Sequence, residues 1–223
     1  MHGNLKAGCF NHIIQLYLRK TYSKYLRVGT SSSLTGAQAA RKVLDENGLY
    51  NVTVEEVRGH LSDHYDPRAK AVRLSSDNYH GTSIASISVA LHEVGHNLQD
   101  RYNYAPLRFR HALVPVANIG SNFSFILIFL GVILSSANLL LLGIVAMAAA
   151  VLFQVVTLPV EFNASSRALD IMVGSGLIRN DKEHGARKVL NAAALTYVAA
   201  TVVALAELLR FVPMFTGMQN DED

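Results

Sequence analysis

The sequence predicts a mainly α-helical integral membrane protein with a small β-hairpin, a transmembrane helical hairpin between two metal-ligand helices, and a C-terminal transmembrane helix. Residues 113–160 contain no charged residue, and residues 189–211 form a third apolar stretch with Glu207 near its far end. Upstream of both, an H-E-x-x-H pattern lies at residues 92–96. Uncharged stretches of this length are typical of membrane spans, and the pattern is typical of metal-binding helices.

Composition separates a polar N-terminal half from an apolar C-terminal half. Half of the 223 residues are hydrophobic, and the net charge is only +3. The basic residues are scattered and form no stripe, so we expect no nucleic-acid partner. The lone Cys9 excludes an intramolecular disulfide and a thiolate zinc cluster.

The H-E-x-x-H pattern lies on a predicted helix over residues 83–99. Positions i and i+4 share one helix face, so His92 and His96 can direct ring nitrogens at one metal ion, for which zinc is well suited. Glu93 can act as the general base toward a water molecule. Gly95 weakens a helix but permits another backbone to approach closely.

The polar half begins with an ambiguous segment. Residues 1–30 contain an apolar patch too short to span a bilayer, followed by basic residues, which fits an interfacial amphipathic helix or a truncated span. Residues 37–47 read as a helix ending at Gly48. Strands are expected over residues 52–57 and 71–75, forming a small β-hairpin beside the metal-bearing helix. We expect the strand over residues 71–75 to accept an extended peptide by strand addition.

The uncharged region reads as two spans, residues 114–135 and 138–158, joined by a turn. Pro159 is expected to end the second span, and residues 161–170 to form a short helix. A hairpin returns to its starting side, and basic residues flank it before and after. Because Lys and Arg mark the cytoplasmic side, the H-E-x-x-H helix is predicted to face the cytoplasm and the acidic tail to lie outside.

A catalytic zinc site needs a third protein ligand. Gln99 and Tyr102 stand where one solution requires Gly and His, so that solution is excluded. No acidic residue occurs between Arg101 and Val160, and Glu161 is the first after the hairpin returns. We therefore predict Glu161 as the third ligand, with Asp170 as the alternative. An interfacial carboxylate at a helix start is the other reading of Glu161.

Several motifs together resemble a known family. The segments DHYDP at residues 63–67, LHEVGH at residues 91–96 and LPVEFNASSR at residues 158–167 are similar to the YugP-type neutral zinc metallopeptidases, membrane gluzincins distantly similar to HtpX and CAAX-prenyl proteases. The resemblance implies a zincin-like helical core, zinc ligands His92, His96 and Glu161, and Glu93 as base. HtpX-like enzymes carry Asp four residues after the third ligand, where Ser165 stands here, so the partner of the ligand histidines remains unassigned.

The expected function is that of a zinc-dependent metalloendopeptidase in a bacterial inner membrane, multi-pass, with peptide or membrane-protein substrates. The alternative is a non-catalytic zinc-binding scaffold or adaptor, whose closed site would take a fourth ligand from His60, His64 or His111. Tyr65, His64 and Tyr197 are the candidates for stabilising an oxyanion.

The segments expected from these patterns follow in chain order. They are residues 1–30, an N-terminal basic or amphipathic segment or truncated span; 31–112, the cytoplasmic zincin-like part; 113–160, the transmembrane hairpin; 161–188, the third-ligand helix and cytoplasmic segment; 189–212, the C-terminal transmembrane helix; and 213–223, an acidic tail.

Overall fold

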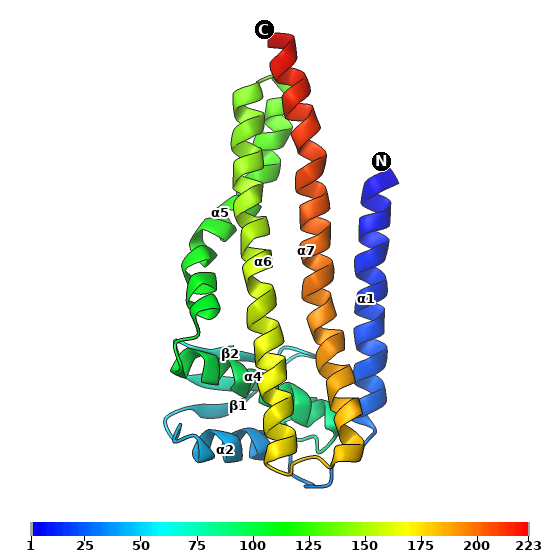
Figure 1. The fold of residues 1–223 in the computed structure, drawn as a ribbon, viewed down its shortest axis with the longest axis vertical. Helices are drawn as coiled ribbons and strands as arrows, with labels where there is room; N and C mark the ends of the chain where they lie inside the picture. The colour runs from blue at the N-terminus through cyan, green and yellow to red at the C-terminus, as the bar shows by residue number, and fades with distance from the viewer. Residues whose placement is uncertain (1, 223) are drawn as a thin grey trace. The chain divides into compact units, whose positions relative to one another are not determined.

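The computed structural model describes the backbone of residues 2–222 and the side chains of residues 8–219. The chain is mainly helical (Figure 1). Its elements are α1 (His2–Leu26), α2 (Gly36–Glu46), β1 (Thr53–Val57), β2 (His64–Asp66), β3 (Ala71–Ser75), α3 (Ser76–Tyr79), α4 (Ile84–Arg101), α5 (Ala105–Ile133), α6 (Ala137–Gly174) and α7 (Asn180–Glu222). Two compact units are present. One comprises residues 12–104 and 160–196, and the other comprises residues 1–11, 105–159 and 197–223.

Helices α2 and α4 begin where the sequence predicts. Thr35 caps α2 in a reciprocal capping box with Gln38, and Gly48 follows the helix with a φ of +69°. Ser83 caps α4, its side chain accepting from the backbone N–H of Ser86. Such caps satisfy backbone donors that a helix start would leave unpaired. The two helices pack closely, since a Cβ added at Gly36 would lie 3.1 Å from the Ser86 carbonyl oxygen of α4.

The strands form a three-stranded mixed sheet of order β1-β3-β2. The two predicted strands pair with each other in parallel, Val54 opposite Val72, so they do not make the hairpin. Strand β2, from the turn-rich segment between them, supplies the hairpin by pairing antiparallel to β3. Strand β3 is therefore central, and the prediction that residues 71–75 accept a peptide by strand addition is wrong. Both β2 and β3 contact α4.

A buried polar network holds the segment that leads into β2. The Asp63 carboxylate accepts hydrogen bonds from the Ser75 backbone N–H at 2.8 Å, the Ser75 hydroxyl and the Asn78 amide at 2.9 Å. The Tyr22 hydroxyl of α1 donates to Asn78 Oδ1 at 2.8 Å. This network connects α1, α3 and the end of β3, and Asp63 anchors the turn before β2 through these contacts.

Helix α6 departs from the prediction at Pro159. Pro159 lies inside a single helix of 38 residues and does not end it. A proline removes one hydrogen bond, but packing of the following turns outweighs that local preference. Val160, Ala164, Ala168 and Met172 are fully buried, and Ala168 and Met172 belong to a core shared with Leu91 and Val94 of α4.

The second unit contains long apolar helices. Within the described part of the chain, three helices are long and apolar enough to cross a membrane, namely Ala105–Ile133, Ala137–Gly174 and Asn180–Gln219. Helices α5 and α6 run antiparallel (Figure 1) and approach closely at glycines, because a Cβ at Gly120 would lie 2.3 Å from the Ala146 carbonyl oxygen. The predicted helical hairpin and the third apolar helix are thus present as candidate spans. Helix α7 also continues through the segment predicted as a tail, whose side chains from residue 220 on lie outside the described residues.

Candidate metal centre

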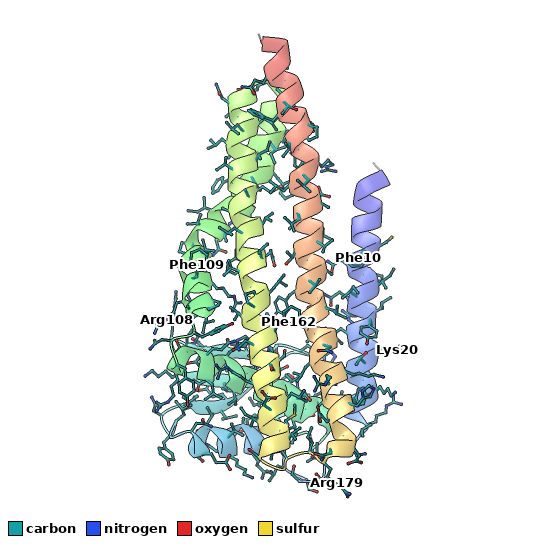
Figure 2. The ribbon with its side chains drawn as sticks, in the orientation of Figure 1. Phe10, Lys20, Arg108, Phe109, Phe162 and Arg179 are labelled. Atoms are coloured by element: carbon teal, nitrogen blue, oxygen red, sulfur yellow. The ribbon has the colours of Figure 1, made fainter. Side chains whose placement is uncertain are left out.

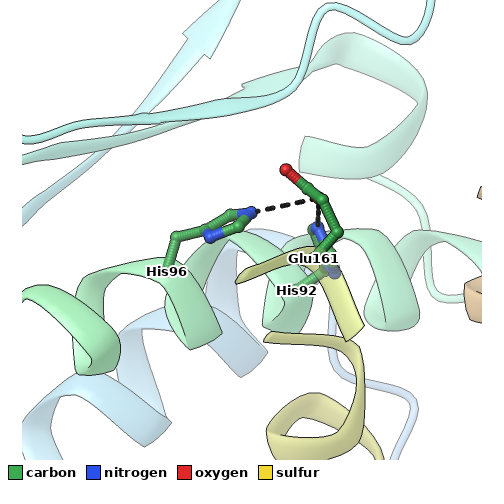
Figure 3. Close-up of side chains that lie close together, drawn as sticks. All are labelled: His92, His96 and Glu161. Atoms are coloured by element: carbon green, nitrogen blue, oxygen red, sulfur yellow. Dashed lines mark hydrogen bonds and ion pairs between the residues drawn. The ribbon is translucent and has the colours of Figure 1, made fainter. Parts of the chain in front are cut away.

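Three donor atoms converge between α4 and α6. His92 and His96 lie one turn apart on α4, and Glu161 faces them from α6 (Figure 3). Their donor atoms all lie within 4.8 Å of one another. Glu161 Oε2 is 3.2 Å from His92 Nε2 and 3.5 Å from His96 Nε2. The structure therefore brings together the three residues that the sequence predicts as ligands.

These separations fit a tetrahedral zinc site. Bonds of about 2.0–2.1 Å at tetrahedral angles place neighbouring donor atoms about 3.3–3.4 Å apart. The two Glu161 distances, 3.2 Å and 3.5 Å, bracket that value. Two imidazoles and one carboxylate are also a donor set that catalytic zinc sites use. The residues present thus fit the metal.

Close helix packing makes this convergence possible. A Cβ added at Gly95 would lie 2.7 Å from the Ala164 carbonyl oxygen, so the absent side chain lets α6 approach α4 as predicted. Glu161 is 2% exposed, whereas its neighbour Phe162 is 49% exposed and labelled in Figure 2. Because α6 begins at Ala137, Glu161 lies in mid-helix and is not a carboxylate at a helix start.

Each histidine has a partner on its other ring nitrogen. Ser165 Oγ lies 3.1 Å from His92 Nδ1, and Gln99 Oε1 lies 3.0 Å from His96 Nδ1. Such contacts orient metal-ligating rings. The Ser165 hydroxyl thus fills the place beside His92 that the sequence left unassigned. Gln99 was missed as a partner, although it is three residues after His96 on the same helix face.

Glu93 lies beside the cluster and is 7% exposed. Burial raises the pKa of Glu93, while the neighbouring His92 and His96 oppose the rise. For His96, burial lowers the pKa, but the hydrogen bond to Glu161 and the charge of Glu93 outweigh it, so the pKa is raised overall. A buried carboxyl with a raised pKa is suited to accepting a proton near neutral pH.

The other candidates are not members of the described cluster. Asp170 is exposed on α6, and among the side chains of residues 8–219 the cluster contains only its three members. His60 contacts Asp77 at 3.5 Å, and His64 Nδ1 lies 2.8 Å from the Ser62 carbonyl oxygen. The Tyr65 hydroxyl donates to Asp100 at 3.2 Å, and burial raises its pKa to about 12. His111 and Tyr197 belong to the other unit.

Comparison with known proteins identifies the family. The model of the family described as "Putative neutral zinc metallopeptidase" matches residues 5–216. The "Putative membrane protease YugP" of Bacillus subtilis (strain 168) is 55% identical over 207 residues, which cover 93% of this chain and 92% of that protein. No solved structure gives a significant match. A family match along nearly the whole chain, with the His92, His96 and Glu161 cluster inside it, shows that the chain belongs to this family of zinc metallopeptidases.

Proposed function

We propose that this protein is a membrane-embedded zinc-dependent endopeptidase that hydrolyses peptide bonds at the cytoplasmic face of the membrane. The observation that carries the proposal is the convergence of His92, His96 and Glu161 at tetrahedral spacing beside a buried Glu93. His92, His96 and Glu161 are the ligands, and the relative from Bacillus subtilis is described as a membrane protease.

Each residue has a defined part in the reaction. When bound, zinc supplies Lewis acidity toward water and toward the substrate carbonyl group. Glu93 accepts a proton from the attacking water as the new C–O bond forms at the scissile carbonyl. It then transfers that proton to the amine as the C–N bond breaks. The burial of Glu93 keeps this proton transfer away from bulk water.

The cytoplasmic orientation rests on charge. Arg101, Arg108 and Arg110 precede the apolar hairpin, and Arg167 and Arg179 follow it. Basic residues near the ends of spans remain on the cytoplasmic side. Both ligand-bearing segments then lie on that side, and the substrate is a peptide segment or a membrane protein presented there.

The three-ligand cluster also bears on the alternative of a non-catalytic zinc scaffold. A structural zinc site is usually closed by four protein ligands. The described side chains of residues 8–219 contribute three, and His60 and His64 have partners outside the cluster. Three ligands leave a coordination position for water, which supports catalysis over a structural role.

The test is zinc content per chain in detergent-purified protein. Wild type is expected to bind about one zinc ion, and Glu161→Ala is expected to lose most of it, since catalytic sites need three protein ligands. Asp170→Ala is the matched control, because Asp170 is exposed on the same helix. Full zinc content in Glu161→Ala would show that another residue is the third ligand. No zinc in wild type after metal addition would contradict the proposed function.

A further inference from the structure

We propose that Gln99 is a positioning residue, which orients the His96 ring and the Glu161 segment of α6 together for metal binding. The inference rests on the proposed zinc ligands. Gln99 is fully buried, with no exposed surface. A buried primary amide has two donors and one acceptor to satisfy, so its contacts are a strong constraint on its neighbours.

The contacts of Gln99 fix which way its amide points. Gln99 Nε2 lies 2.7 Å from the Val160 carbonyl oxygen, which can only accept. It also lies 3.0 Å from Asn163 Oδ1, an atom that already accepts from Arg167 Nε at 2.8 Å. Two separate acceptors therefore place the nitrogen of Gln99 toward α6. Its oxygen is left facing His96.

This orientation decides the state of the His96 ring. Gln99 Oε1 can only accept, so His96 Nδ1, 3.0 Å away, must carry the proton. His96 Nε2 then faces Glu161 and is available as a metal ligand. The contact of Ser165 with His92 does not decide this, because a hydroxyl both donates and accepts. Gln99 therefore determines which nitrogen of its histidine carries the proton, whereas Ser165 does not.

The same side chain also holds the third ligand. Val160 and Asn163 lie on either side of Glu161 along α6, and Gln99 hydrogen bonds to both. The Gln99 amide on α4 thus contacts His96 of the same helix and binds α6 on both sides of Glu161. Removal of the amide is expected to disturb His96 and Glu161 together, and hence metal affinity.

The experiment compares Gln99→Met with Ser88→Ala by chelator competition for zinc. Methionine keeps the length of the side chain and loses its hydrogen bonds. Ser88 is the matched control, since it is fully buried on α4 and its hydroxyl donates to Met172 Sδ of α6 at 3.7 Å. Loss of a ligand-orienting partner lowers metal affinity by about 10–100-fold, which is expected for Gln99→Met. Ser88→Ala is expected to stay within about threefold of wild type, below that range.

A second readout is the visible absorption spectrum of the Co²⁺-substituted protein, which responds to ligand geometry. It is expected to change in Gln99→Met and to match wild type in Ser88→Ala. Wild-type zinc affinity and spectrum in Gln99→Met would overturn the proposal. An equal loss in both variants would also overturn it, because the effect would then be one of helix packing alone.

Gln99→Glu keeps the test available if the methionine variant does not fold. Glutamate retains an acceptor for His96 Nδ1 and loses the donors to α6. Because the proposal assigns the positioning of Glu161 to those donors, zinc affinity is expected to fall by about tenfold or more, and a smaller fall overturns the proposal. All of these outcomes are measured relative to wild-type protein that binds zinc. Absence of zinc in wild type itself would instead count against the proposed function.

Discussion

Glu93 and Glu161 are two buried carboxyl groups with different surroundings. Glu161 lies within 3.5 Å of both histidine Nε2 atoms, whereas Glu93 is outside the three-membered cluster. Burial raises the pKa of Glu93, as suits a group that takes up a proton. Environment thus distinguishes the proposed metal ligand from the proposed base, although the two residues are chemically alike.

Glu93→Gln is expected to abolish peptide hydrolysis and leave zinc bound. Glutamine fills the same space but cannot accept the proton from water, and loss of a general base costs about 10²–10⁴-fold or more in rate. Zinc content per chain and hydrolysis of an unfolded protein substrate are measured on the same preparation. Retained hydrolysis would refute the role of Glu93, and lost zinc would show that Glu93 supports the ligands instead.

At this scale the sequence predicts the ligands better than their partners. His92 and His96 follow from helix periodicity, and Glu161 follows from being the first acidic residue after the uncharged hairpin. The contacts of Gln99 with Val160 and Asn163 join positions more than 60 residues apart. No local pattern encodes such a contact, because it exists only when α6 packs against α4.

The packing of α4 against α6 depends on Gly95. Gly95→Ala is expected to lower the free energy of unfolding by about 1–3 kcal/mol, because the new methyl group would overlap the Ala164 backbone. Displacement of α6 should also weaken zinc binding. Thermal unfolding and chelator competition check both effects.

Gly174→Ala is the matched control for that substitution. Gly174 ends α6, and a Cβ there meets nothing within 4 Å. Stability at or above that of wild type is expected, since alanine favours a helix. Equal destabilisation in the two variants would show that helix contact at Gly95 is not the cause.

Arg73 connects all three strands of the sheet, and its contribution to the stability of the fold should depend on pH. It contacts Glu55 of β1 at 3.0 Å and Asp66 of β2 at 2.6 Å. Hydrogen bonds from the Ala69 backbone and from Arg73 lower the pKa of Asp66, and those from Thr53 and Arg73 lower the pKa of Glu55. Groups with lowered pKa stabilise the fold above their ordinary pKa and lose that contribution as pH falls.

Arg73→Met is therefore expected to lower the thermal midpoint at neutral pH. The difference from wild type should shrink as pH falls through the carboxyl range, because both proteins then lose the charged partners. Thermal scans of wild type and variant over this range provide the measurement. A difference that stays constant with pH would indicate lost packing of the Arg73 stem instead.

Elements with strong local signals were predicted well, and those set by tertiary contacts were not. The caps at Thr35 and Ser83 mark the starts of α2 and α4. In contrast, Pro159 favours a helix end locally, but the buried turns after it continue α6. The parallel pairing of β1 with β3 likewise depends on a crossover that periodicity does not report.

At the scale of the whole molecule, the proposed orientation can be tested with single cysteines. In a Cys9→Ser background, Ser135→Cys lies in the exposed turn between α5 and α6, and Arg58→Cys is exposed in the polar unit. A membrane-impermeant thiol reagent added to intact cells is expected to label position 135 and not position 58, as the positive-inside rule requires. Labelling of position 58 alone would reverse the orientation.

The order of the ligands along the chain has a consequence for biosynthesis. A ribosome completes His92 and His96 before it makes any part of the hairpin, and Glu161 comes only after both apolar spans. A nascent chain that ends before residue 161 therefore contains only two of the three proposed ligands. The proposed zinc site therefore cannot be completed before both apolar stretches of the hairpin have been synthesised.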